Sequence, residues 1–321
     1  MLATLGHLPP DEDAWAYEIK WDGERVLAYV ETVGLKLQSR NGNDISARYP
    51  ELAPLAAAAG SREMILDGEI VAFDEEGVPR FERLQPRMHV TDPLRIAVLA
   101  RTAPVALKIF DVLWLDDEPL LRRPYLERRE RLAALGLNDE HWQTPGHRLG
   151  GGRECVAFSR ERGHEGIIAK RPQSIYEPGK RTRTWIKVKN TNRQEFVIAG
   201  WVPGTGRRVR LPGALLVGYY DPSERDAGGR PVLRYAGKVG TGFTEAELDR
   251  LKRLFEPLAI ESSPFTGAQP PDRDARFVRP QLVAEIEFTE WTREGLLRHP
   301  SYKGLRDDKA PTEVVREVPS A

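Results

Sequence analysis

Apolar and polar residues alternate along much of the first 190 positions of the chain. Between Trp15 and Ser39, the segments WAYEIK, ERVLAYVE and LKLQS alternate in this way and are separated by Asp22-Gly23 and by Gly34. Alternation with a period of two between turn residues predicts antiparallel strands. Similar segments predict further strands over 64–77, 105–117, 166–171 and 184–190. Helices are predicted over the Ala-rich segment 47–60, the amphipathic segment 122–137 and the segment 155–163.

The pattern changes after about residue 193. QEFVIAGWV, ALLVGYYD and VLRYAGKVG predict short strands, 243–258 predicts a helix with Thr244 as its N-cap, and QLVAEIEFTEW predicts a final strand. Strands interrupted by one helix in this order are typical of a small five-stranded barrel of the oligonucleotide-binding type. We therefore expect an α+β protein, with antiparallel sheets and flanking helices over 1–193 and a five-stranded OB-fold barrel over 194–321.

Composition limits the partners of the chain. Its 48 basic and 48 acidic residues give a formal net charge of zero, so no global positive field attracts a polyanion. A nucleic acid would have to contact local basic clusters, and 170–193 is such a segment. With Cys155 as the only cysteine, no internal disulfide can form. The chain shows no signal-peptide pattern and no apolar run of ~18 residues, so we expect a soluble cytoplasmic protein with no membrane association.

The most distinctive motif is Lys20-Trp21-Asp22-Gly23-Glu24-Arg25 at the end of a predicted strand. Alone, it could be no more than a lysine before an Asp-Gly hairpin turn. Further motifs follow in order along the chain: SRNG at 39–42, LDGE at 66–69, IFD at 109–111, EGIIAK at 165–170 and WIKVK at 185–189. This ordered set is far more specific than any single motif.

In these motifs the sequence resembles the covalent nucleotidyltransferase superfamily of ATP-dependent DNA ligases, RNA ligases and mRNA capping enzymes. It most resembles the ligase module of bacterial non-homologous end-joining ligases, and the resemblance continues through EFVIAGW, GALLVGYYD, YAGKVGTGF and AEIEFTEWTREGLLRHPSYKGLRDDK. The resemblance implies an adenylation domain over 1–193 and an OB-fold domain over 194–321. It also implies ATP and Mg²⁺ (or Mn²⁺) as cofactors, and Lys20 as the residue that carries AMP.

A lysine that attacks the α-phosphate of ATP must be neutral, whereas a free lysine has a pKa near 10.4. Neighbouring cations and partial burial would lower the pKa of Lys20. Lys187 and Lys189 alternate on one predicted strand, so both side chains point to one face. Without the other motifs, an ordinary solvated face would be an equally good interpretation. By resemblance, this face supplies positive charge to the α-phosphate.

The resemblance assigns the nucleotide and metal contacts to five further residues. Glu165 helps to hold the metal, and Glu69 contacts the ribose, the metal or a metal-bound water. Mg²⁺ usually takes only one or two protein carboxylates. Phe110 resembles the aromatic residue that stacks on adenine, although a plain core phenylalanine is the alternative. Glu18 and Ile19 resemble the positions that meet the adenine edge.

Arginine guanidinium groups suit phosphate oxygens geometrically. Arg25, Arg40 and Arg181 are therefore candidates for binding the ribose and the phosphates of the nucleotide or the nick. In the C-terminal segment RHPSYKGLRDDK, Arg306 and Lys309 match the family's last motif, which orients pyrophosphate during lysine adenylation. A solvated basic tail is the alternative for this segment.

We therefore predict an ATP-dependent DNA ligase that seals 3′-hydroxyl/5′-phosphate nicks, acting as a monomer on nicked duplex DNA. An RNA ligase or a guanylyl-transferring capping enzyme would use the same lysine and remains an alternative. A non-catalytic DNA-end-binding protein with a decayed pocket is an alternative of another class. The end-joining resemblance also suggests a Ku-type end-binding protein as a partner.

Overall fold

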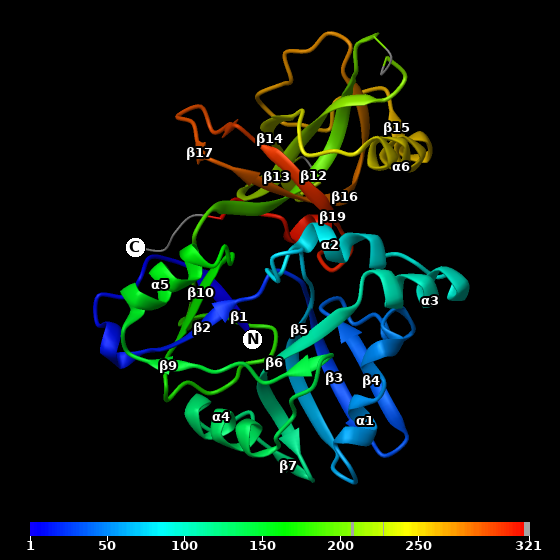
Figure 1. Ribbon diagram of the computed structural model, residues 1–321. Helices are drawn as coiled ribbons and strands as arrows, with labels where there is room; N and C mark the ends of the chain where they lie inside the picture. The colour runs from blue at the N-terminus through cyan, green and yellow to red at the C-terminus, as the bar shows by residue number, and fades with distance from the viewer. Residues whose placement is uncertain (207–208, 227, 318–321) are drawn as a thin grey trace. The chain divides into compact units, whose positions relative to one another are not determined.

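The computed structural model describes residues 1–206, 209–226 and 228–317, and these form two compact units, Met1–Asn190 and Thr191–Glu317 (Figure 1). The strand that opens the second unit, β12, begins at Asn192. The domain boundary predicted at 193/194 therefore falls inside this strand.

Two antiparallel-rich sheets form the first unit and lie side by side in it (Figure 1). The first has the order β1-β11-β10-β2-β9, and the second has the order β4-β3-β5-β6-β7 with β8 added beside β6. The strands of the first sheet are β1 (Leu2–Leu5), β2 (Ala16–Lys20), β9 (Arg148–Leu149), β10 (Gly166–Lys170) and β11 (Arg181–Lys189). Those of the second are β3 (Glu24–Glu31), β4 (Gly34–Ser39), β5 (Met64–Ala72), β6 (Val105–Leu115), β7 (Glu118–Pro119) and β8 (Trp142–Gln143).

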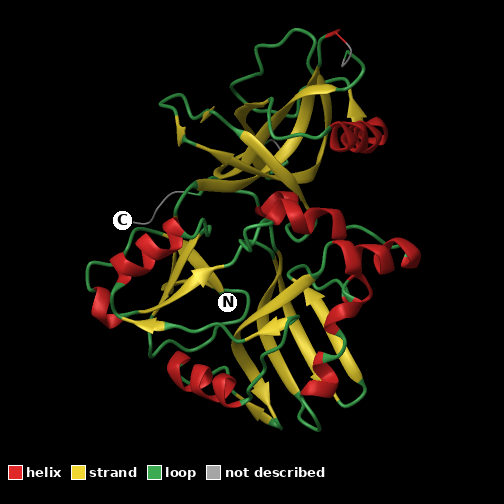
Figure 2. Cartoon of the chain, in the orientation of Figure 1, coloured by secondary structure: helices red, strands yellow, loops and turns green. Residues whose placement is uncertain are grey.

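Helices lie along the outer sides of these sheets (Figure 2). They are α1 (Leu55–Ala58), α2 (Phe81–Leu84), α3 (Pro93–Thr102), α4 (Tyr125–Ala134) and α5 (Gly152–Glu161). The helix predicted over 47–60 is wrong as a single element. It is divided into 3₁₀ turns at Ser46–Arg48 and Pro50–Leu52 and the short α1, because Pro50 and Pro54 cannot donate the backbone hydrogen bonds of a continuous helix.

The two faces of the β3–β5–β6 sheet differ in chemistry. Val26, Ala28 and Val30 point into the large core that α1 and α2 cover. The alternate positions of β3 and β5 point the other way, toward the sheet of β2, β10 and β11. There a smaller cluster joins Leu27 of β3 to Trp185 of β11. The space between the sheets of the first unit therefore receives side chains from both.

The second unit is a curled, OB-fold-like sheet with the order β14-β13-β12-β16-β15, and β19 pairs with β16. Breaks in register, such as the one between Ile198 and Gly200, bend the long strands. Thr244 caps α6 by accepting a hydrogen bond from the Glu247 N–H, as predicted. The elements are β12 (Asn192–Pro203), β13 (Pro212–Arg225), β14 (Pro231–Val239), α6 (Glu245–Phe255), β15 (Ala259–Ile260), β16 (Arg276–Phe288), β17 (Glu290–Trp291), β18 (Leu297–Arg298) and β19 (Ser301–Arg306).

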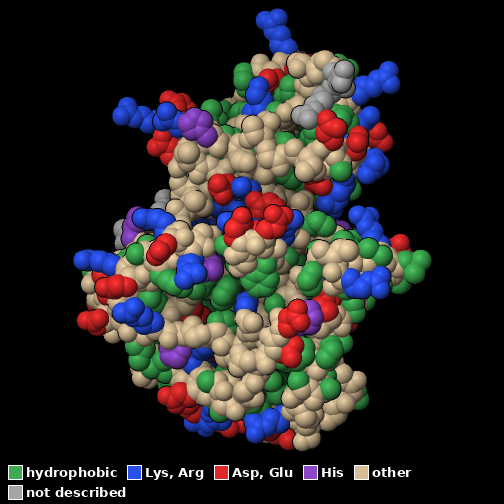
Figure 3. Space-filling view, in the orientation of Figure 1, with side chains coloured by type: hydrophobic (Ala, Val, Ile, Leu, Met, Phe, Trp, Pro, Cys, Tyr) green, Lys and Arg blue, Asp and Glu red, His purple; other side chains and the backbone are tan. Residues whose placement is uncertain are grey.

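None of the helices in the described part of the chain combines the length and the apolar character needed to cross a membrane. Basic and acidic side chains are interspersed on the face shown in Figure 3, as the zero net charge leads one to expect.

Candidate active site

Lys20 and Lys189 lie in one row across three neighbouring strands. Gly166 of β10 pairs with Lys20 of β2 on one side and with Lys189 of β11 on the other. Residues directly opposed in antiparallel strands project from the same face, so the two lysine side chains share a face. Two residues further along the strands, Glu18 and Lys187 form the next row on that face. The structure thus brings these four predicted residues together.

Gly166 is required at the centre of this row. A Cβ atom there would lie 2.2 Å from the carbonyl oxygen of Val188, a distance at which the backbone has to move. The glycine lets β10 and β11 approach closely, and it leaves room above the row for the side chains of Lys20 and Lys189.

The carboxylate of Glu165, directly before β10, contacts both lysines of the row. One oxygen forms an ion pair with Nζ of Lys20, and the other lies 3.7 Å from Nζ of Lys189. Only 5% of the Glu165 side chain and 20% of the Lys20 side chain are exposed. The candidate nucleophile is therefore held by a nearly buried carboxylate.

Burial acts to lower the pKa of Lys20, as expected from the sequence, but the nearby carboxylates outweigh it. Glu165 is the strongest of them, and Glu69 and Asp22 add to it, so the pKa of Lys20 is raised above its usual value. The prediction that neighbouring cations lower this pKa is therefore wrong for this structure, because negative charges dominate around the amine. A neutral Lys20 can form only when the charge of Glu165 is engaged elsewhere.

The facing sheet contributes a second row formed by Arg25, Glu69 and Lys108 of β3, β5 and β6. Arg25 donates two parallel hydrogen bonds to Asp67, at 2.9 and 2.6 Å, and Tyr176 donates to the same carboxylate at 2.8 Å. Asp67 is fully buried, so these two hydrogen bonds anchor the Arg25 guanidinium and limit its reach toward a ribose.

Phe110 lies at the edge of an aromatic box around Lys170. Nζ of Lys170 is 4.8 Å from the centre of the Phe110 ring, 4.9 Å from that of Tyr125 and 4.1 Å from that of Trp185. The same ammonium forms an ion pair with Glu18, which lowers the pKa of Glu18 against the effect of burial. Phe110 is only half-buried, so part of its ring remains available for stacking, unlike that of a plain core residue.

Ile19 differs from its neighbours in direction. It pairs with Ile167, whose side chain packs with Tyr17 in the cluster on the α5 side of the sheet. Alternation along β2 therefore turns the Ile19 side chain away from the face that carries Lys20. Only the main chain of Ile19 could meet a nucleotide on the lysine face.

Arg181 is not brought into this cluster. Arg181 begins β11, eight residues before Lys189, which corresponds to about 26 Å at ~3.3 Å per residue. Its guanidinium donates to the carbonyl oxygen of Ala3. Arg40 lies in the turn that follows β4.

Arg306 and Lys309 belong to the second unit and are held in a nearly buried charge network there. Arg306 donates to both oxygens of Asp308, at 2.8 and 2.6 Å, and to Glu285 at 3.0 Å. Lys309 donates to Glu195 at 3.0 Å. The two residues are therefore fixed parts of this unit, and the alternative of a solvated tail is wrong.

Lys108 was not singled out from the sequence. Burial lowers its pKa from 10.5 to about 8, and its amine donates to Oε1 of Gln143 between the rings of Trp21 and Phe73. The signal was present, because Lys108 is the one charged residue in the apolar run VALKIF that leads to Asp111.

Glu165 and Glu69 fit a Mg²⁺ or Mn²⁺ ion that also binds substrate phosphates. Among the described residues there is no group of three or more His, Cys, Asp or Glu side chains that would enclose a metal by itself. Mg²⁺ usually keeps water and phosphate ligands beside one or two carboxylates. The donor set therefore suits a metal that arrives with a nucleotide.

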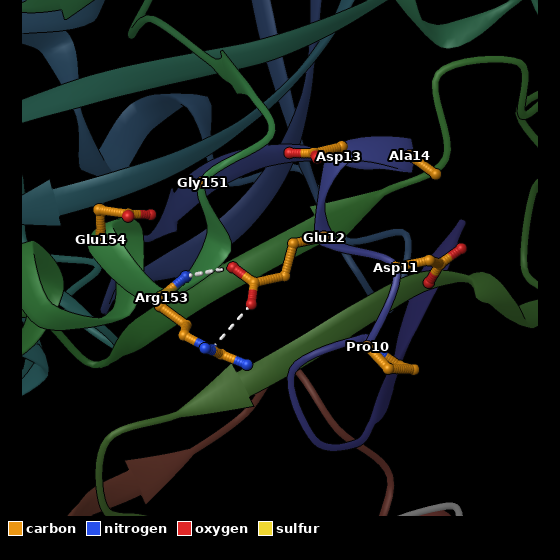
Figure 4. Close-up of a pocket in the computed structure, with 8 residues that line it drawn as sticks. All are labelled: Pro10, Asp11, Glu12, Asp13, Ala14, Gly151, Arg153 and Glu154. Carbon is orange, nitrogen blue, oxygen red and sulfur yellow. Dashed lines mark hydrogen bonds and ion pairs between the residues drawn. The ribbon is translucent and has the colours of Figure 1, made fainter.

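A separate pocket lies at the start of α5, beyond the face of the sheet opposite Lys20 (Figure 4). There Glu12 accepts a hydrogen bond from the backbone N–H of Arg153 at 2.8 Å and pairs with its guanidinium at 2.9 Å. Glu12 thereby satisfies a free N–H of the helix terminus, which is a structural role.

The curled antiparallel sheets and the OB-fold-like second unit, with a lysine, a glutamate and a Lys-x-Lys strand on one face, define a covalent nucleotidyltransferase architecture. The family model described as "ATP dependent DNA ligase domain" matches residues 8–189, and that of the "ATP dependent DNA ligase C terminal region" matches residues 207–309. The chain belongs to the ATP-dependent DNA ligase family.

Its relatives include the "Multifunctional non-homologous end joining protein LigD" of Mycolicibacterium smegmatis, 42% identical over 99% of this chain and 39% of that protein. The protein of the same name from Pseudomonas aeruginosa is 38% identical over 99% of this chain and 36% of its own length. A solved structure of "mycobacterial DNA ligase D complexed with ATP and MES" is similar, with a TM-score of 0.71 and 39% identity over 98% of this chain and 97% of that one. The chain thus spans about two-fifths of the length of these LigD relatives.

Proposed function

We propose that the chain seals 3′-hydroxyl/5′-phosphate nicks in DNA with ATP, through an AMP bonded to Lys20. Membership of the ligase family supports the class of reaction. The single observation that supports the mechanism is the row in which Lys20, Glu165 and Lys189 meet at the end of β2.

In the first step, Nζ of Lys20 attacks the α-phosphorus of ATP. An N–P bond forms, the bond to the bridging oxygen breaks, and pyrophosphate leaves. The amine must first lose its proton to water, which would become favourable once the charge of Glu165, in direct contact with the amine, is engaged by a bound cation. Lys187 and Lys189 on the same face neutralise charge that develops on the α-phosphate and the leaving group.

Residues around Lys20 suit the adenine base, the ribose and the phosphates of the nucleotide. The half-buried ring of Phe110 can stack on adenine. Lys170 joins Phe110 to Glu18, and Glu18 and Ile19 precede Lys20 on β2. Glu69 and Arg25 form the neighbouring row, where a ribose would be bound. Mg²⁺ or Mn²⁺ held at Glu165 and Glu69 would supply positive charge for the phosphates.

In the second step the 5′-phosphate of a nick takes AMP from Lys20, and in the third the 3′-hydroxyl displaces AMP and closes the backbone. The first unit (Met1–Asn190) then acts as the adenylation domain predicted over 1–193, and the second (Thr191–Glu317) acts as the OB-fold domain predicted over 194–321. Arg306 and Lys309 of the second domain orient pyrophosphate during lysine adenylation. Phosphates of the DNA backbone are contacted by Arg40 and by the basic residues of 170–193, which include Arg181.

The biological setting follows from the LigD relatives. The proposed role is bacterial DNA repair by end joining in the cytoplasm, with the chain acting as a monomer and a Ku-type protein presenting the DNA ends.

Sealing of a nicked duplex, with the 5′ and 3′ strands made of DNA or RNA in turn, tests this function. Sealing that depends on ATP and a divalent metal, and that prefers DNA on both sides, is expected. Sealing of RNA alone would overturn the DNA assignment, and adduct formation from GTP in place of ATP would indicate a capping-type enzyme. Addition of a cognate Ku without any rise in the rate of end joining would contradict the proposed partner.

A further inference from the structure

Lys108 of β6 is a buried cation with no counter-ion. Only 5% of the residue is exposed, and its amine donates a hydrogen bond to Oε1 of Gln143. The ring centres of Trp21 and Phe73 lie 5.0 and 5.1 Å from Nζ. No carboxylate among the described residues lies within ion-pair distance of this amine.

The other buried cations of the first unit are all paired. Each forms an ion pair with a carboxylate: Lys170 and Arg129 with Glu18, Arg128 with Asp111, and Arg87 with Glu51. Removing an ammonium from water without a counter-ion is costly, and contacts with aromatic faces offset only part of that cost. A buried ammonium without a counter-ion at this position is therefore suited to an anion that arrives from outside.

Lys108 also lies beside the reacting groups. It pairs directly with Glu69 across β5 and β6, and Trp21, over which its amine lies, follows Lys20 in the chain. The Trp21 ring contacts His164 at 5.8 Å, and the half-exposed Phe158 lies 6.4 Å from His164. Ring contacts thus connect Lys108 with Phe158 at the surface of the first unit.

We propose that Lys108, between the rings of Trp21 and Phe73, forms a phosphate-binding subsite of the ligation reaction. This inference rests on the proposed function. The phosphate belongs either to the DNA strands at the nick or to the triphosphate tail of the nucleotide. A phosphate oxygen would take the place of the missing carboxylate and accept a hydrogen bond from the ammonium.

Three variants test the subsite. Lys108→Met removes the charge and keeps the length of the side chain, Lys108→Arg keeps the charge, and Lys36→Met removes an exposed lysine of β4 as a matched control. Two reactions are measured separately: adenylation of Lys20 at varied ATP, and sealing of a pre-adenylated nick at varied DNA and salt. The melting temperature of each variant is recorded beside them.

We expect Lys108→Met to raise the KM for one of the two substrates about tenfold or more, since a hydrogen bond between charged groups is lost. Lys108→Arg recovers most of this loss, and Lys36→Met does not change either KM. If the phosphate is that of DNA, the negative slope of the logarithm of the DNA-binding constant against the logarithm of salt concentration becomes less steep by about 0.9 in Lys108→Met. If it is that of the nucleotide, the KM for ATP rises and the salt slope is unchanged.

The melting temperature separates binding from packing, because loss of an unpaired buried charge should leave the protein at least as stable. A lower melting temperature with both KM values within about twofold of the wild type would overturn the subsite. If the wild-type chain forms no lysyl-AMP and seals no nick, the proposed function fails. If the wild type does both and Lys108→Met equals it, only the subsite fails.

Discussion

Glu165→Gln should make Lys20 more reactive as a free amine. Glu165 forms the ion pair that does most to raise the pKa of Lys20. The glutamine keeps the size of the side chain and removes its charge. In the variant a larger fraction of Lys20 is neutral at any given pH, so Lys20 reacts faster with an amine-selective reagent in the absence of ATP and metal.

The size of the effect follows from the geometry. Two unit charges about 4 Å apart interact by about 4 kcal/mol at an effective dielectric constant of about 20. Solvent reaches a fifth of the Lys20 side chain, and Glu69 and Asp22 remain in the variant. We therefore expect about 1.4–2.7 kcal/mol, or a rise of about 10- to 100-fold in the rate of Lys20 labelling.

The assay is acetylation at pH ~9 for fixed times, followed by peptide mass spectrometry with Lys20 and Lys180 measured in the same digest. Lys180 pairs with Glu177 on the surface at 2.9 Å, so Glu177→Gln is the matched control, with an expected change in Lys180 labelling of less than about threefold. Equal Lys20 labelling in the wild type and Glu165→Gln would refute the view that Glu165 keeps this amine protonated.

Two further predictions concern stability and the spacing of the site. Asp67→Asn leaves Arg25 without its buried partner and should lower the free energy of unfolding by about 3–5 kcal/mol, whereas the exposed pair partner Glu75→Gln should change it by less than about 0.5 kcal/mol. Burial acts to raise the pKa of Asp67 but Arg25 holds it below its usual value, so the stabilisation is present above pH ~4 and is lost as the pH falls through the folded-state pKa. Denaturant titrations should therefore show the wild type and Asp67→Asn converging in acid, and a constant difference down to pH ~2 would contradict this. Gly166→Ala forces β10 and β11 apart, so it should lower the free energy of unfolding by about 1–3 kcal/mol and slow adenylation. Gly146→Ala, where a Cβ atom meets nothing within 4 Å, should change neither. An unchanged melting temperature and adenylation rate for Gly166→Ala would refute the close approach of the two strands.

Strands were easier to predict from the sequence than helices. Alternation located β2, β3 and β4 between turn residues, and it is clearest in β3, where every second residue is buried. The helix over 47–60 was overpredicted, since its alanines suggested helix while Pro50 and Pro54 divided it. The helix α3 was missed although Asp92 and Pro93 mark its start, and the side chain of Asp92 accepts a hydrogen bond from the Leu94 N–H.

The candidate site was predictable as a set of motifs but not as a set of contacts. The order of the motifs along the chain pointed to Lys20, Glu165 and Lys189. The ion pair between Lys20 and Glu165 joins positions 145 residues apart and depends on the register of β2, β10 and β11. For the same reason, the electrostatic dominance of carboxylates around Lys20 and the burial of Lys108 without a counter-ion could not be predicted from the chain alone.

The proposed ligase mechanism depends on a covalent bond between Lys20 and AMP. The direct measurement is the intact mass of the purified chain after incubation with ATP and Mg²⁺, followed by peptide mapping of the modified residue. The expected result is the added mass of one AMP on Lys20, its loss after addition of pyrophosphate, and no adduct on Lys20→Ala. An unmodified chain, or AMP on another residue with Lys20→Ala still labelled, would contradict it.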